Sequence, residues 1–102
     1  MPSAMQQTIA DLLIATGSAH GDYETTALGG AYDPDWATWY AAYLLDHGLG
    51  SLLGVPDSIG ADRLAHILFS YDEAYRHERP TDPWPLDYAR RLLIDFAPIP
   101  VR

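Results

Sequence analysis

The residues with the clearest chemical potential are a histidine and a glutamate one helical turn apart. His20 and Glu24 stand at i and i+4 in a stretch with helical apolar spacing, with Tyr23 between them. A helical hairpin would bring Asp33 and Asp35 close to this pair. An imidazole beside a carboxylate can carry a proton or ligate a metal while the carboxylate orients the ring. The structural interpretation, which such pairs more often support, is a histidine at the edge of the core whose ring N–H is satisfied by Glu24.

Four aromatic side chains form a ridge on the segment 33–48. At about 100° per residue, one side of the helix collects Trp36, Trp39, Tyr40 and Tyr43, and the other side collects Thr38, Ala41 and Ala42. Each large aromatic buries roughly 150–250 Å², so four of them in water would exceed the largest apolar patch of a typical monomer. The ridge is therefore expected to be core, a contact with a second copy or the wall of a pocket. Aromatic stripes at helical spacing are usually core.

A cleft between this ridge and the His20–Glu24 pair would form a ligand site. Its predicted ligand-binding residues are His20, Tyr23, Glu24, Trp36, Trp39 and Tyr40. If these groups are buried instead, His20 and Glu24 supply hydrogen-bond partners for the Tyr and Trp polar atoms, which need partners in a core.

No catalytic residue, metal ligand or cofactor is assigned from the sequence. The chain has no cysteine, no HExxH pair, no Gly-rich phosphate loop and no G-x-S-x-G turn. One face of the predicted third helix carries histidines and carboxylates and is interpreted as a solvated face; these residues are Asp62, His66, Glu73 and His77. Phe69 on the same face would suit a symmetric dimer contact.

The composition indicates one soluble, acidic domain over residues 1–102. A chain of 102 residues with 48% hydrophobic and 20% charged residues is large enough for a single core. Residues 1–62 hold eight carboxylates and no Lys or Arg, whereas residues 63–102 hold six of each sign, so the whole net charge of −8 comes from the first part. Such a field repels phosphate backbones, which argues against nucleic-acid binding. We find neither a secretory signal nor a membrane span and expect a cytoplasmic protein.

The pattern of apolar residues predicts an all-α fold of about four helices, arranged as two antiparallel helical hairpins. The predicted helices cover residues 3–27, 33–48, 61–77 and 81–96. Gly17 introduces a kink or break into the first helix. Residues 48–60 form a loop that packs on the core, and residues 97–102 lie extended along the bundle.

The start and the end of the second helix and one face of the fourth helix carry specific expectations. Asp33 is the predicted N-cap of the second helix, with Pro34 at the first helical position and Gly48 as the left-handed residue after its end. In the fourth helix, Asp87, Arg91 and Asp95 are expected to line the solvent face at i, i+4 spacing.

A comparison of the two halves of the chain suggests an internal repeat. At an offset of 48 residues the second and fourth helices share five residue types: Trp36 and Trp84, Tyr40 and Tyr88, Ala41 and Ala89, Leu44 and Leu92, Leu45 and Leu93. Both segments also begin with Asp-Pro. The match suggests two hairpins of the same design related by an approximate two-fold axis.

The first half of the chain resembles a pattern in small uncharacterised bacterial helical proteins. The resemblance rests on the runs His20–Glu24 and Leu28–Leu44, with a weaker echo over Trp84–Leu93. It implies a helical fold and attaches no activity, cofactor or substrate.

The sequence favours a protein that acts by binding over an enzyme. The first reading is a homodimer, or a module for a protein partner, with the ridge in the core or the contact. The alternative is a small enzyme or ligand-binding module with an aromatic pocket near His20 and Glu24. A third reading is that the acidic first half docks onto a basic partner protein.

Overall fold

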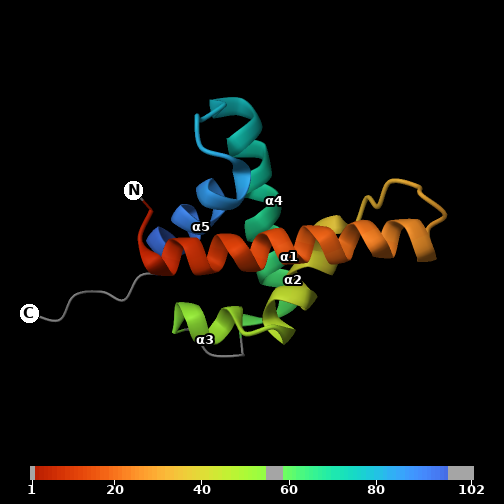
Figure 1. Cartoon of the computed structure of the whole chain (residues 1–102), viewed down its shortest axis with the longest axis horizontal. Helices are drawn as coiled ribbons and strands as arrows, with labels where there is room; N and C mark the ends of the chain where they lie inside the picture. The colour runs from red at the N-terminus through yellow and green to blue at the C-terminus, as the bar shows by residue number, and fades with distance from the viewer. Residues whose placement is uncertain (1, 55–58, 97–102) are drawn as a thin grey trace, which may run out of the picture.

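The computed structural model describes residues 2–54 and 59–96, which form five α-helices (Figure 1). In chain order they are α1 (Ala4–Ala27), α2 (Trp36–Asp46), α3 (Leu49–Leu53), α4 (Ala61–Glu78) and α5 (Trp84–Asp95). Over these ranges there is no strand, so the predicted all-α fold is confirmed, with one short helix more than expected. The predicted extended segment 97–102 lies outside the described residues. None of the described helices has the length and apolar character needed to span a membrane.

The first helix, α1, is continuous over 24 residues. Ser3 caps its start, because its side chain accepts a hydrogen bond of 3.0 Å from the backbone N–H of Gln6. At the other end Gly30, with φ of +85°, donates from its N–H to the carbonyl oxygen of Glu24 at 2.8 Å. A glycine adopts this left-handed backbone without strain, which explains why α1 ends here.

The predicted break at Gly17 is absent, because α1 is helical throughout Ala4–Ala27, and the glycine serves close packing instead. A Cβ atom at Gly17 would stand only 3.2 Å from Tyr40 Oη and 3.8 Å from the Trp84 ring. The bare backbone of α1 at this position therefore lets side chains from α2 and α5 lie directly against it.

The second helix begins at Trp36, slightly later than predicted. Asp33 does not cap the helix itself. Its Oδ1 accepts a hydrogen bond of 2.9 Å from the N–H of Asp35, which closes a turn just ahead of the helix. The prediction that Gly48 is left-handed is confirmed by its φ of +96°.

The buried side of α2 carries small residues rather than the aromatic ridge. Ala37, Ala41 and Leu44 are buried, whereas all four ridge aromatics are half-buried. The expectation that Ala41 points away from the core is therefore wrong. Small side chains allow neighbouring helix backbones to approach closely, and the large rings then pack around the edges of that contact.

Part of the predicted loop 48–60 is helical. Leu49–Leu53 forms α3, and Leu49 and Leu53 are buried in the main core. The expectation that this connection packs on the core is confirmed for these residues, while residues 55–58 lie outside the described ranges.

The fourth helix agrees closely with its prediction. Leu64, Leu68 and Tyr71 are buried. The residues expected on the opposite face, Asp62, His66, Phe69, Glu73 and His77, are all exposed.

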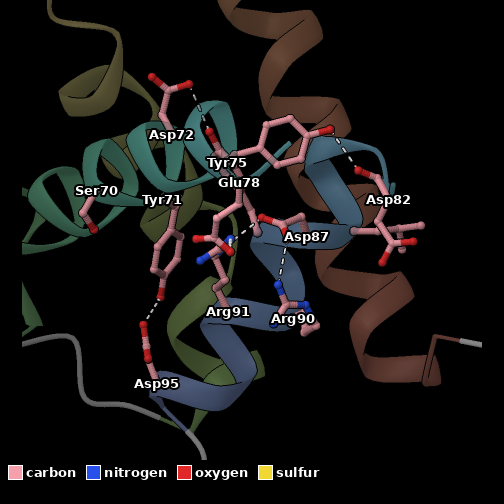
Figure 2. Close-up of polar contacts among 12 residues, drawn as sticks. Ser70, Tyr71, Asp72, Tyr75, Glu78, Asp82, Asp87, Arg90, Arg91 and Asp95 are labelled. Atoms are coloured by element: carbon pink, nitrogen blue, oxygen red, sulfur yellow. Dashed lines mark hydrogen bonds and ion pairs between the residues drawn. The ribbon is translucent and has the colours of Figure 1, made fainter. Parts of the chain in front are cut away.

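In α5 the predicted solvent face is wrong at Asp87. This residue is only 1% exposed. Its two carboxylate oxygens accept hydrogen bonds from Arg90 Nη2 at 2.8 Å and from Arg91 Nε at 2.7 Å (Figure 2). Arg91 also lies 3.3 Å from Glu78 at the end of α4. A carboxylate can be buried when charged partners satisfy its oxygens, and two arginines one turn further along α5 do so here.

The most extensive helix contacts pair α2 with α4 and α1 with α5. An offset of 48 residues matches α1 with α4 and α2 with α5. An approximate two-fold axis between the two halves would therefore map the contact of α2 with α4 onto the contact of α5 with α1. Burial supports the same relation, because Ala41 and Ala89 are both fully buried, as are Leu44 and Leu92. The contact pattern is thus the one expected of two similar halves packed together.

Candidate functional site

A pocket of about 470 Å³ lies between the C-terminal halves of α1 and α4. In Figure 1 these two helices cross, and their C-terminal ends diverge toward the right and the top of the molecule. Six aromatic side chains line the pocket: Tyr32, Trp36, Tyr40, Tyr75, Trp84 and Tyr88. Its volume falls within the range of small-molecule sites, and mostly apolar walls with a few polar groups are typical of such sites.

Four polar residues complete the lining: His20 and Glu24 from α1, and Asp72 and Arg76 from α4. Each pair stands at i and i+4 on its helix, so both members project from the same helix face. Tyr32 is 74% exposed, and the Arg76 side chain is 68% exposed. The pocket therefore reaches solvent beside these two residues.

His20 is held between two carboxylates. Its Nε2 lies 2.8 Å from Asp33 Oδ2, and its Nδ1 lies 3.7 Å from Glu24 Oε1. His20 and Asp33 are both buried. The second oxygen of Glu24 accepts a hydrogen bond of 3.1 Å from the backbone N–H of Asp33. This network ties the segment before α2 to α1.

The opposite wall has a carboxylate with its own partners. Asp72 accepts hydrogen bonds from Arg76 at 2.6 Å and from the Tyr88 hydroxyl at 3.3 Å. The Tyr75 hydroxyl, also drawn in Figure 2, donates to the carbonyl of Asp82 at 2.9 Å. The polar atoms of Asp72, Tyr75 and Tyr88 on this wall thus have hydrogen-bond partners within the protein.

The aromatic rings form two edge-to-face pairs that contact each other. Trp36 and Tyr40 have ring centroids 5.6 Å apart at 88°, and Trp84 and Tyr88 have centroids 5.1 Å apart at 66°. Tyr40 also meets Trp84 edge to face at 6.4 Å. Edge-to-face contact is a preferred arrangement of aromatic rings, so the walls support one another.

Two of the tyrosines have similar electrostatic surroundings. Burial raises the pKa of Tyr40, and the negative charge of Glu24 raises it further. Burial likewise raises the pKa of Tyr88, followed by the charge of Asp72 and its hydrogen bond. Both hydroxyls therefore stay protonated at neutral pH and remain hydrogen-bond donors.

The pocket lining repeats at the offset of 48 residues. Trp36 matches Trp84, Tyr40 matches Tyr88, and Glu24 matches the acidic Asp72. A carboxylate, a tyrosine and a tryptophan from each half of the chain therefore face the same space. The pocket lies where the two halves meet.

Four of the six predicted ligand-binding residues line this pocket: His20, Glu24, Trp36 and Tyr40. Tyr23 and Trp39 do not line it. Both pack beside the His20 ring, with centroid distances of 5.9 Å and 5.0 Å.

Sequence reasoning missed six lining residues, five of them contributed by the second half of the chain. They are Tyr32, Asp72, Tyr75, Arg76, Trp84 and Tyr88. The offset that pairs Trp36 with Trp84 could have found three of them, because it also pairs Tyr40 with Tyr88 and Glu24 with Asp72. No comparable pattern in the sequence indicated that Tyr32, Tyr75 and Arg76 would line the pocket.

Within residues 2–54 and 59–96, no group of three or more His, Asp or Glu side chains has a metal-binding arrangement. The polar face of α4 carries exposed side chains, as described above. Comparison of the chain with models of known protein families, with curated proteins and with solved structures gave no match.

Proposed function

We propose that this protein is a ligand-binding module that takes a small molecule into the aromatic pocket between its two halves. The observation that carries the proposal is a cavity of about 470 Å³ with six aromatic rings and four polar side chains converging on it. Leaving that much aromatic surface around an open space costs stability unless something occupies it. Each half of the chain supplies a tryptophan, a tyrosine and a carboxylate at matching positions to the lining, which further favours a site shared by the two halves.

The three tryptophans offer a direct test. Trp36 and Trp84 line the pocket, whereas Trp39 does not. A library of small molecules is titrated into ¹⁵N-labelled protein, and the indole N–H signals are followed by NMR. Binding in the pocket shifts the Trp36 and Trp84 signals and leaves Trp39 nearly unchanged.

A matched pair of variants distinguishes binding in the pocket from nonspecific binding elsewhere on the protein. Tyr32→Ala removes an exposed wall of the pocket, and Tyr43→Ala removes a tyrosine outside it. A pocket ligand loses affinity in the first variant and keeps it in the second. Ligands that shift all three indole signals equally, or no ligand at all, would contradict the proposal.

A second proposal is self-association through the outer face of α4. Phe69 is 45% exposed, and its ring stacks on the half-buried Trp36 with centroids 6.2 Å apart. The two rings form one continuous aromatic surface that a second copy would cover. Sedimentation over a wide concentration range tests this, with Phe69→Asp expected to shift any dimer to monomer. A wild-type protein that stays monomeric throughout would rule it out.

A further inference from the structure

We infer that the pocket selects an organic cation, an alkylated ammonium group in particular. The inference rests on the proposed binding function and names its ligand class. It combines two properties of the same site, the aromatic walls and an excess of negative charge.

The walls are rich in aromatic rings, which can attract a positive group. Six of the ten lining residues are Trp or Tyr, and they come from both halves of the chain. The face of an aromatic ring is the negative side of its quadrupole and attracts a cation within about 6 Å of the ring centroid, with Trp the strongest partner. A cavity lined by two tryptophans and four tyrosines has a composition suited to an ammonium carrying methyl or methylene groups.

The charge of the site is negative on the α1 side. The network there contains two carboxylates, Glu24 and Asp33, and one imidazole, His20. Its net charge is therefore negative whether or not the ring is protonated. On the α4 side the charge of Asp72 is offset by Arg76 at 2.6 Å.

Glu24 is the residue placed to act as counter-ion. Its Oε2 accepts from the N–H of Asp33, but its Oε1 lies 3.7 Å from His20 Nδ1, beyond hydrogen-bond distance. A neutral ligand that covered Glu24 would take a carboxylate out of water without giving it a partner, which is unfavourable. An anionic ligand would add repulsion. A cation both satisfies Glu24 and gains from the rings.

The alkylated ammonium could belong to a free small molecule or to a methylated lysine side chain. The pocket reaches solvent beside Tyr32 and Arg76, so either source has access. The recognised chemistry is the same in both, and the two are separated by the experiment below.

The first experiment compares choline with 3,3-dimethylbutan-1-ol, which has the same shape but carbon in place of the charged nitrogen. Binding is measured by calorimetry and by the Trp36 and Trp84 indole shifts. We expect choline to bind at least about tenfold more tightly than the neutral analogue, as a cation–π site predicts. Equal binding, or tighter binding of the neutral analogue, would overturn the cation inference and leave the pocket function standing. If neither of these compounds nor the trimethyllysine peptide described below binds at millimolar concentrations, the cation inference fails, and the library titration followed by the Trp36 and Trp84 signals decides the proposed function separately.

The second experiment tests the role of Glu24. Glu24→Gln removes the charge and keeps an amide oxygen able to accept from the N–H of Asp33. Asp22→Asn is the matched control, because Asp22 is an exposed carboxylate on the same helix that does not line the pocket. We expect Glu24→Gln to weaken choline binding about five- to tenfold, with little effect on the neutral analogue. The control keeps wild-type affinity. Equal effects of the two substitutions would overturn the assignment of Glu24 as counter-ion.

A third experiment, with peptides, distinguishes a free small molecule from a methylated lysine side chain as the source of the cation. A peptide with one trimethyllysine is compared with choline and with the unmodified peptide. Binding of the trimethylated peptide alone assigns the cation to a methylated protein, and binding of choline with no gain from the peptide assigns it to a small molecule.

Discussion

The Nε2 atom of His20 lies 2.8 Å from Asp33 Oδ2, and both side chains are buried at the junction of α1 with the segment leading into α2. The contact joins residues 13 apart in the chain and fixes the start of α2 against α1. Trp36 and Tyr40 follow directly, so the position of one pocket wall depends on this pair. His20 thus has a structural role together with its place in the pocket lining.

The His20–Asp33 contact predicts a strongly coupled pair of substitutions. His20→Ala leaves a buried carboxylate without its partner and is expected to lower the free energy of unfolding by about 3 kcal/mol. Asp33→Ala should also destabilise, and the double variant should cost less than the sum of the two. Denaturant unfolding of all four proteins measures the interaction energy. Additive effects would show that the two side chains do not depend on each other.

Two glycines of α1 predict opposite responses to alanine. A Cβ at Gly21 has nothing within 4 Å, so Gly21→Ala is expected to stabilise the protein by up to about 1 kcal/mol through helix propensity. At Gly17 a Cβ would stand 3.2 Å from Tyr40 Oη. Gly17→Ala requires the Tyr40 hydroxyl to give way by a few tenths of an ångström, which reduces or reverses the gain, and because Tyr40 lines the pocket the variant should also bind ligand more weakly. Thermal unfolding compares the two variants, and an equal gain at both positions would contradict close packing at Gly17.

Much of the helical framework could be predicted from local signals. Ser3 starts α1, Gly30 follows its end and Gly48 follows the end of α2, because capping and left-handed glycines are properties of the nearby backbone. Which side of a helix is buried depends on its neighbours. The size of the aromatics suggested that they form the core of α2, yet Ala37 and Ala41 occupy it.

The pocket could be predicted only in part for the same reason. His20, Glu24, Trp36 and Tyr40 stand close together in the first half of the chain. Asp72 comes from the other half and reaches the same space through the pairing of α1 with α5 and of α2 with α4. Periodicity within one helix carries no information about that pairing, whereas the 48-residue repeat does.

The buried Asp87 predicts a large loss of stability on substitution. Asp87→Ala removes a carboxylate that is 1% exposed and leaves Arg91, whose side chain is 17% exposed, without its main partner. We expect a cost of about 3–5 kcal/mol, as for other broken buried ion pairs. Asp22→Ala on the surface of α1 is the control and should change stability by less than about 0.5 kcal/mol. A small effect at Asp87 would show that the arginines find other partners.

The buried tyrosines Tyr71 and Tyr88 predict that the fold weakens at alkaline pH. Burial raises the pKa of Tyr71, and its hydrogen bond to Asp95 raises it further (Figure 2); the pKa of Tyr88 is raised by burial and by Asp72. Above about pH 10 the unfolded chain releases these phenolic protons while the folded protein retains them. The folded state then binds more protons, so the free energy of unfolding falls as pH rises, by up to about 1.4 kcal/mol per pH unit for each tyrosine.

Phenylalanine variants test this pH dependence. Tyr71→Phe and Tyr88→Phe each remove one phenol that loses its proton only in the unfolded chain. Each variant should therefore reduce the slope with which the free energy of unfolding falls between pH 10 and 11, by up to about 1.4 kcal/mol per pH unit. The same variants measured at pH 8 serve as controls, because there the phenol is protonated in both folded and unfolded chains and any change reports only the lost hydrogen bond. Urea unfolding at several pH values supplies the free energies. A decline that keeps its wild-type slope in both variants would show that other groups cause the alkaline loss of stability.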